Sequence, residues 1–195
     1  MKKEPPNILL IMADQMTPFM LEACGGSGAK TENMTKLAAR SANFTTTYTP
    51  SPICVPARSC FMTGLYTSTT GCYDNGDPYP SFIPTFAHYL TNAGYETVLS
   101  GKMHFVGPDQ MHGFASRKVF DHSSDWYGGS EYSLGVLDKA QRPFKESILN
   151  SGAGQMSYEV LDREVTSQTI KFLKNFKAEK ENGVEKPFAL QVGFM

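Results

Sequence analysis

The sequence contains few residues that could cross-link or anchor it. It has four cysteines in 195 residues, Cys24, Cys54, Cys60 and Cys72. Four cysteines in a chain of this size do not make a disulfide framework, and their spacings match no zinc-binding pattern. An apolar run of about 18 residues is also lacking, so the sequence predicts no transmembrane helix.

Net charge is almost absent as well. The chain carries 18 basic and 19 acidic residues, for a formal net charge of -1. This balance gives no sign of a nucleic-acid or membrane-surface partner, and we expect neither. It leaves open whether the protein forms an oligomer.

The N-terminus lacks the features of a secretory leader. Lysines precede an apolar run, but the run from Ile8 to Ala13 is only six residues long, two prolines precede it, and Asp14 follows at once. A buried strand fits this pattern better than a leader. We therefore expect a cytoplasmic protein, unless the start of the chain was trimmed.

The remaining composition supports a folded domain, because 41% of the residues are hydrophobic. Short apolar runs predict strands, and the first of them is typical of a strand buried on both faces. The predicted strands are 7–13, 43–48, 95–100 and 187–193. The predicted helices are 31–41, 58–63, 84–93 and 158–177.

The alternation of these elements predicts an α/β fold with a mainly parallel central sheet and helices on both faces. Residues 108–155 are rich in Gly, Ser, Asp and aromatic side chains and predict long loops. Trp126 and Tyr127 lie there and could pack against a quaternary ammonium group, or could simply anchor the loop.

Polar side chains follow three of the predicted strands. In parallel α/β sheets, ligands bind at the carboxyl ends of the strands, so these side chains could share one site. They are Asp14, Gln15, Cys54, Arg58, Lys102 and His104.

Each of these residues also has a purely structural interpretation. Asp14 could cap a helix or a turn, and Lys102 could be a solvated surface lysine. His104 could be a hydrogen-bonded structural histidine, and Cys54 a small buried hydrophobic residue. The joint arrangement is harder to explain by chance than any single residue, so it favours a functional site.

The residues also carry a family resemblance. CVPARSCFMTG, residues 54–64, resembles the Cys-x-Pro-x-Arg…Thr-Gly signature of the type I, formylglycine-dependent sulfatases of the alkaline-phosphatase superfamily. PNILLIMADQ resembles the first strand of that family, and GKMHFVGPDQMHGF resembles its Gly-Lys-x-His segment. Within the family, MADQMTPF, TGCYDNG and IPTFAHYL are similar to choline-sulfatase-like members, and several bacterial carbohydrate sulfatases share parts of these segments.

The resemblance implies that Cys54 is oxidised to formylglycine by a maturation enzyme that reads this stretch in the unfolded chain. The hydrated aldehyde is a geminal diol, in which one oxygen attacks sulfur and the other later expels sulfate. The implied substrate is a small sulfate ester, either choline sulfate or a sulfated carbohydrate. A non-catalytic truncated remnant stays open as an alternative, as does a phosphonate or phosphodiester hydrolase of the same superfamily.

The resemblance also implies a divalent cation, Ca²⁺ or Mg²⁺, bound by Asp14, Gln15 and the modified Cys54. Two positions depart from the family pattern. Gln15 stands where most sulfatases have a second acid, which removes one negative charge from the site. Ala57 stands where serine is common in the signature.

The resemblance implies roles for three more residues. Arg58 would hold the diol and the carboxylates of the metal site. Lys102 would stabilise the sulfate oxygens in the transition state. His104 would take the proton from the second hydroxyl during sulfate release.

Sulfatases of this kind are much longer than this chain. We therefore expect residues 1–195 to be the N-terminal part of a sulfatase catalytic domain, with an incomplete sheet and exposed apolar surface. The remaining metal ligands and the acid that protonates the leaving group would lie beyond residue 195.

Overall fold

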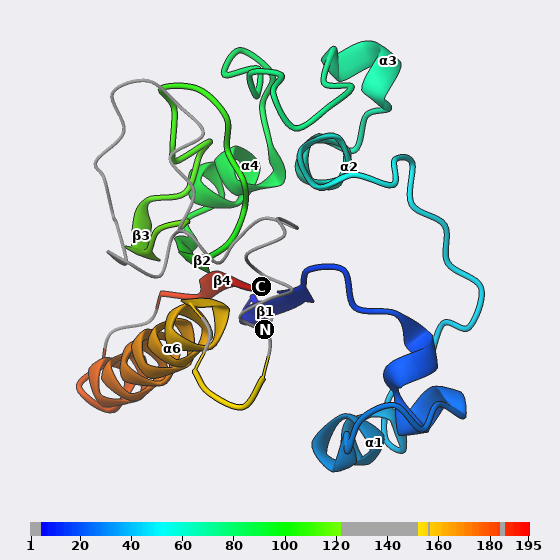
Figure 1. Cartoon of the computed structure of the whole chain (residues 1–195). Coiled ribbons are helices and arrows are strands. Elements are labelled where there is room, and N and C mark those ends of the chain that lie inside the picture. The colour runs from blue at the N-terminus through cyan, green and yellow to red at the C-terminus, as the bar shows by residue number, and fades with distance from the viewer. Residues whose placement is uncertain (1–4, 122–151, 156, 184–185) are drawn as a thin grey trace.

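A computed structural model describes residues 5–121, 152–155, 157–183 and 186–195. It shows a four-stranded sheet with the order β1-β4-β2-β3, in which every neighbouring pair is parallel (Figure 1). The strands are β1 (Ile8–Ala13), β2 (Glu96–Gly101), β3 (Ser116–Val119) and β4 (Phe188–Phe194). The predicted mainly parallel sheet is therefore confirmed.

Helices lie on both faces of this sheet, as predicted (Figure 1). The α-helices are α1 (Glu32–Ala38), α2 (Cys54–Thr63), α3 (Thr67–Thr70), α4 (Phe86–Asn92) and α6 (Ser157–Glu181). Two short 3-10 helices precede them, η1 (Pro18–Met20) and η2 (Glu22–Cys24). Neither α3 nor the 3-10 helices are predicted from the sequence.

The core has two parts, one on each face of the sheet. Val98 of β2 belongs to the cluster under α6, together with Leu161 and Val165 of that helix. Leu99, the next residue of β2, belongs to the cluster on the other face, together with Ala87 of α4. Because neighbouring strand residues point to opposite faces, β2 contributes to both clusters.

The prediction that the first strand is buried on both faces is wrong. Leu9 is 45% exposed and Ile11 is 64% exposed. Leu9 and Ile11 share one face of β1, which lies at the edge of the described sheet. The described helices that pack on the sheet, α4 and α6, contact the other three strands instead. The fully apolar run of β1 therefore leaves part of its surface in contact with water.

The predicted strand over 43–48 is also wrong. These residues form no strand, and Phe44 and Tyr48 are 81% and 87% exposed. Their β-branched and aromatic side chains favour a strand only where a neighbouring strand and a packed surface are present. In the part of the chain that the structure describes, no strand pairs with this segment. The segment leads instead from α1, which lies away from the sheet, to α2 (Figure 1).

The prediction of long loops over 108–155 is wrong at Ser116–Val119, which form β3 beside β2. Residues 122–151, including Trp126 and Tyr127, lie outside the described residues. Among the described helices, none has both the length and the apolar character needed to cross a membrane. All four cysteines are free thiols, which agrees with the predicted lack of a disulfide framework.

Helix α2 begins at Cys54, four residues earlier than predicted. Pro56 is the third residue of this helix, where a backbone N–H has no partner within the helix, so the ring removes no bond. At the other end, Gly64 adopts a left-handed φ of 71° and its N–H donates to the carbonyl of Cys60 at 2.8 Å. The Thr-Gly pair of the sequence signature thus marks the end of the helix.

Candidate active site

Strand β4 brings the ends of β1 and β2 together. The backbone N–H of Asp14 donates to the carbonyl of Phe194 at 3.1 Å, and the backbone N–H of Lys102 donates to the carbonyl of Gly193 at 2.9 Å. A Cβ on Gly193 would overlap the backbone of Lys102, so the close approach requires glycine at this position. Asp14, which follows β1, and Lys102, which follows β2, therefore lie on opposite sides of the end of β4.

Helix α2 brings Cys54 to the same edge of the sheet. Its N-cap residue, Ile53, offers no side-chain hydrogen bond. Asn75 caps the helix instead, because its Oδ1 accepts a hydrogen bond from the backbone N–H of Val55 at 2.9 Å. Cys54 thus lies at the N-terminus of a ten-residue helix, where the helix dipole favours negative charge.

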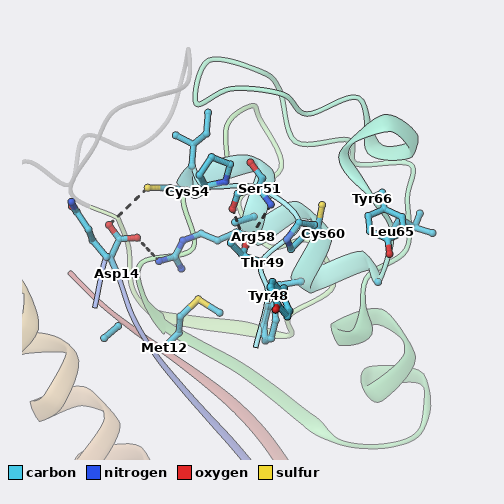
Figure 2. Close-up of a pocket in the computed structure, with 18 residues that line it drawn as sticks. Met12, Asp14, Tyr48, Thr49, Ser51, Cys54, Arg58, Cys60, Leu65 and Tyr66 are labelled. Atoms are coloured by element: carbon cyan, nitrogen blue, oxygen red, sulfur yellow. Dashed lines mark hydrogen bonds and ion pairs between the residues drawn. The ribbon is translucent and has the colours of Figure 1, made fainter. Parts of the chain in front are cut away.

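Asp14 is the centre of the polar contacts at this edge. Its Oδ1 accepts a hydrogen bond from Nη2 of Arg58 at 2.9 Å, and its Oδ2 accepts one from Nζ of Lys102 at 2.9 Å. The thiol of Cys54 lies 3.8 Å from the same Oδ2. Figure 2 shows Cys54 and Arg58 both pointing from α2 toward Asp14.

The two cations of this cluster are buried. Arg58 is 3% exposed and Lys102 is 6% exposed. Arg58 also donates from Nη1 to the backbone carbonyl of Lys102 at 2.9 Å, so it joins α2 to the end of β2. Buried charges of this kind are stable only while they are paired.

The cations decide the protonation state of Asp14. Burial by itself would raise the pKa of Asp14, but the hydrogen bonds from Lys102 and Arg58 and their positive charge outweigh it, and the pKa is lowered. Asp14 is therefore ionised at neutral pH.

His104 completes the cluster. A hydrogen bond with His104 is the largest influence on the Cys54 thiol and lowers its pKa. Burial opposes this shift, and the charge of Lys102 adds to it. The thiolate form of Cys54 is thus favoured, although the charge of Asp14 opposes it, and a lowered pKa suits a nucleophile. His104 itself has a left-handed φ of 55°.

A cavity of about 980 Å³ opens beside Cys54. Asp14, Cys54 and Arg58 contribute to its polar wall (Figure 2). Gln15 also lines the cavity. Much of the remaining wall is apolar and comes from Tyr48, Ile53, Phe61, Leu65 and Tyr66. A volume of this size holds a small organic molecule.

The residues predicted to bind a cation form one side of such a site. Asp14 is ionised and 18% exposed at its side chain, and Gln15 lines the same cavity. Calcium requires about six to eight oxygen ligands, however, and the described residues include no cluster of three or more His, Cys, Asp or Glu side chains that could hold a metal. The described residues therefore fit a cation site only in part.

The structure brings together most of the residues that the sequence singles out. Asp14, Cys54, Arg58 and Lys102 are in direct contact, and His104 interacts with Cys54. Gln15 follows Asp14 with a left-handed φ of 53° and is exposed.

Sequence reasoning misses two residues that support this cluster. Asn75 holds the N-terminus of α2 from 20 residues away, and only its place in an Asp-Asn-Gly turn sequence marks it. Asp121 accepts hydrogen bonds from the backbone of the loop that carries His104. No local pattern identifies Asp121, because its partners are 17 and 18 residues earlier in the chain.

Comparison with known proteins gives a consistent result. The sequence model of the sulfatase family matches residues 6–195. The choline-sulfatase of Rhizobium meliloti is 39% identical over 97% of the chain. An N-acetylglucosamine-6-O-sulfatase of Bacteroides thetaiotaomicron is 31% identical over 65% of the chain.

The chain spans 38% of the length of the first of these relatives and 21% of the second. Among solved structures, a phosphonate monoester hydrolase of Agrobacterium radiobacter has a TM-score of 0.68 and 22% identity, with 98% of this chain and 41% of that chain covered. A likeness at this level of identity concerns the fold alone.

Proposed function

The chain belongs to the sulfatase family, and from this premise we propose that it carries part of the active site of an enzyme that hydrolyses sulfate esters. The observation that supports the proposal is the joint contact of Cys54, Arg58 and Lys102 with Asp14 at the carboxyl ends of β1 and β2. These residues are up to 88 positions apart in sequence, so the fold itself assembles the cluster.

Cys54 is the proposed site of the nucleophile, after conversion to formylglycine by a maturation enzyme. Its Sγ marks the position that the oxygens of the hydrated aldehyde would take. One oxygen would form a bond to sulfur while the bond from sulfur to the ester oxygen breaks. The position at the helix N-terminus favours the negative charge that gathers there.

His104 is proposed to remove the proton from the second hydroxyl of the diol. The carbonyl then re-forms, the bond to the sulfate oxygen breaks, and sulfate leaves. His104 follows Lys102 by two residues after the end of β2, and its hydrogen bond with the Cys54 thiol lowers the pKa of that thiol, which supports this role. Lys102, buried and already paired with Asp14, would stabilise the sulfate oxygens.

Asp14, Gln15 and the modified Cys54 are proposed as ligands of a divalent cation, Ca²⁺ or Mg²⁺. The ionised state of Asp14 supports this assignment. The cation would polarise the sulfate group and lower the cost of forming the nucleophile. Arg58 would keep Asp14 in place beside it.

The proposed substrate is a small sulfate ester. The relatives named above support two candidates, choline sulfate and a hexosamine 6-sulfate. The size and largely apolar wall of the cavity leave room for an organic group beside the sulfate. Residues 1–195 are proposed to be the N-terminal part of the catalytic domain.

The proposal is tested with the complete protein that carries this sequence, co-expressed with a formylglycine-generating enzyme. Mass spectrometry of the peptide containing Cys54 should show the lower mass of formylglycine. The protein should hydrolyse 4-nitrophenyl sulfate in the presence of calcium. Cys54→Ala should abolish the hydrolysis, whereas Cys24→Ala should not, because Cys24 is exposed and lies outside the cluster.

Two outcomes would overturn the proposal. An intact thiol at Cys54 together with no hydrolysis of any sulfate ester would indicate a non-catalytic sulfatase-like protein. Hydrolysis of a phosphonate monoester or phosphodiester in preference to 4-nitrophenyl sulfate, choline sulfate and a hexosamine 6-sulfate would indicate a different hydrolase of the superfamily.

A further inference from the structure

The loop over 101–107 carries Lys102 and His104, two of the proposed site residues. Arg58 holds this loop from the side of α2, through its hydrogen bond to the carbonyl of Lys102 at 2.9 Å. A second arginine, Arg117 of β3, has a side chain that is 1% exposed and donates to the carbonyl of Gly101 at 3.3 Å. Two guanidinium groups thus bond the backbone at the start of this loop.

Asp121 connects Arg117 to the backbone of the loop. Its Oδ2 accepts a hydrogen bond from the N–H of His104 at 2.7 Å and one from the N–H of Met103 at 3.2 Å. The same oxygen accepts one from Nη2 of Arg117 at 2.9 Å. The side chain of Asp121 is 9% exposed and that of Arg117 is 1% exposed, so water competes little for these bonds.

The backbone of His104 needs such support. Its φ of 55° is in the left-handed region, which is uncommon for a residue with a side chain. A conformation of this kind persists only where the surroundings fix it. Two successive N–H groups directed at one carboxylate oxygen form an anion-binding concavity, and the carboxylate of Asp121 occupies it.

Arg117 extends this support along the loop. Its Nη2 lies 3.3 Å from the carbonyl of Gly101, and its Nη1 lies 3.1 Å from the carbonyl of Gln110. Gln110 in turn donates from Nε2 to the carbonyls of Phe105 at 2.7 Å and Gly107 at 2.9 Å. The loop is therefore held before and after His104 as well.

We propose that Asp121 is a positioning residue for His104. By fixing the left-handed backbone of His104, it directs the imidazole toward Cys54. The inference rests on the proposed function, in which His104 accepts a proton from the modified Cys54. Asp121 bonds the backbone N–H groups of Met103 and His104, and its proposed effect on the reaction passes through His104.

The chain contains a matched control for this arrangement. Oδ1 of Asp109 accepts hydrogen bonds from the N–H groups of Met111 at 2.9 Å and His112 at 3.0 Å. His112 also has a left-handed φ, of 39°. Its ring packs between Tyr79 and Phe105, with centroid distances of 4.2 and 4.5 Å, and not against the proposed nucleophile. Asp109→Ala thus removes the same kind of support from a histidine outside the site.

The first test needs no enzymatic activity. In protein labelled with ¹³C and ¹⁵N, the Cε1–Hε1 signal of His104 is assigned with His104→Ala and followed by NMR. We expect Asp121→Ala to shift or broaden this signal more than Asp109→Ala does. Asp121→Asn keeps the shape of the side chain and one acceptor oxygen. If Asp121→Ala does not fold, Asp121→Asn is measured in its place and should still shift the His104 signal. An unchanged signal in the folded Asp121 variants, or an equal change in Asp109→Ala, would overturn the inference.

The second test measures hydrolysis of 4-nitrophenyl sulfate by the complete matured protein. Asp121→Ala should lower kcat about 100-fold with little change in KM, because a displaced proton acceptor affects the reaction and not ground-state binding. In a His104→Ala background, Asp121→Ala should cause no further fall, because the imidazole that Asp121 positions is already absent. Equal falls in both backgrounds would contradict the inference. If the wild-type protein hydrolyses no sulfate ester, the proposed function fails, and the NMR comparison still decides the role of Asp121.

Discussion

Removal of the Asp14 carboxylate should leave two buried cations without the negative charge that pairs with them. Arg58 and Lys102 are 3% and 6% exposed, and each donates one hydrogen bond of 2.9 Å to Asp14. Loss of one partner of a buried ion pair typically costs about 3–5 kcal/mol, because the remaining charge stays buried. The side chain of Asp14 is 18% exposed, so water can partly replace it. We therefore expect Asp14→Ala to lower the free energy of unfolding by about 3 kcal/mol.

The assay is urea unfolding followed by circular dichroism, in a buffer with a chelator so that no divalent cation binds Asp14. Glu159→Ala is the control. Glu159 lies 3.9 Å from Arg163 on α6, and both side chains are at least half exposed, so its loss should cost no more than about 0.5 kcal/mol. Equal destabilisation by Asp14→Ala and Glu159→Ala would refute the reasoning.

Two further measurements test the cause of this effect. The double variant Asp14→Ala/Lys102→Met should lose less free energy of unfolding than the sum of the losses in the two single variants. The reason is that the second change removes one of the cations that Asp14→Ala leaves unpaired. The advantage of the wild type over Asp14→Ala should also depend on pH. Since the folded pKa of Asp14 is lowered, its contribution is present above its ordinary value of 3.8 and is lost as the pH falls through the folded pKa. Additive effects in the double variant would contradict this explanation.

Three further predictions concern residues outside the cluster around Asp14. Burial lowers the pKa of His112 to about 4 from 6.5, so the wild type should lose up to about 3 kcal/mol of stability as the pH falls from 6.5 to 4. His112→Phe should show a smaller loss over that range in urea unfolding. Gly193→Ala should cost about 1–3 kcal/mol, because its Cβ would overlap the backbone of Lys102, and a melting temperature equal to the wild type would contradict this. Asn75→Ala should cost about 1 kcal/mol by removing the acceptor for the N–H of Val55, and hydrogen exchange of that amide should become faster than in the wild type.

The sequence alone predicts most of the regular elements of this protein. Apolar runs predict β1, β2 and β4, and amphipathic periodicity predicts α1, α4 and α6 within a few residues of their ends. These patterns are local, since each depends on neighbours a few positions away. The Cys-x-Pro-x-Arg stretch likewise carries the family resemblance in a short segment, and the match of the sulfatase family over residues 6–195 confirms it.

Contacts between segments that are distant in sequence decide the parts of the fold that the sequence does not predict. Residues 43–48 have the composition of a strand but pair with none of the described strands, and β1 has the composition of a central strand but lies at the edge of the described sheet. Both differences arise because strand composition does not specify which strands pair.

The tertiary structure alone also shows how the site is held. The pairing of Asp14 with Lys102 joins residues 88 positions apart, and it exists because β4 lies between their strands. The hydrogen bond from His104 to Asp121 depends on β3 lying beside β2, a strand that the sequence does not predict. The sequence therefore predicts which residues form the site and what chemistry they can perform. Their geometry depends on the strand order and on polar side chains that no local pattern marks.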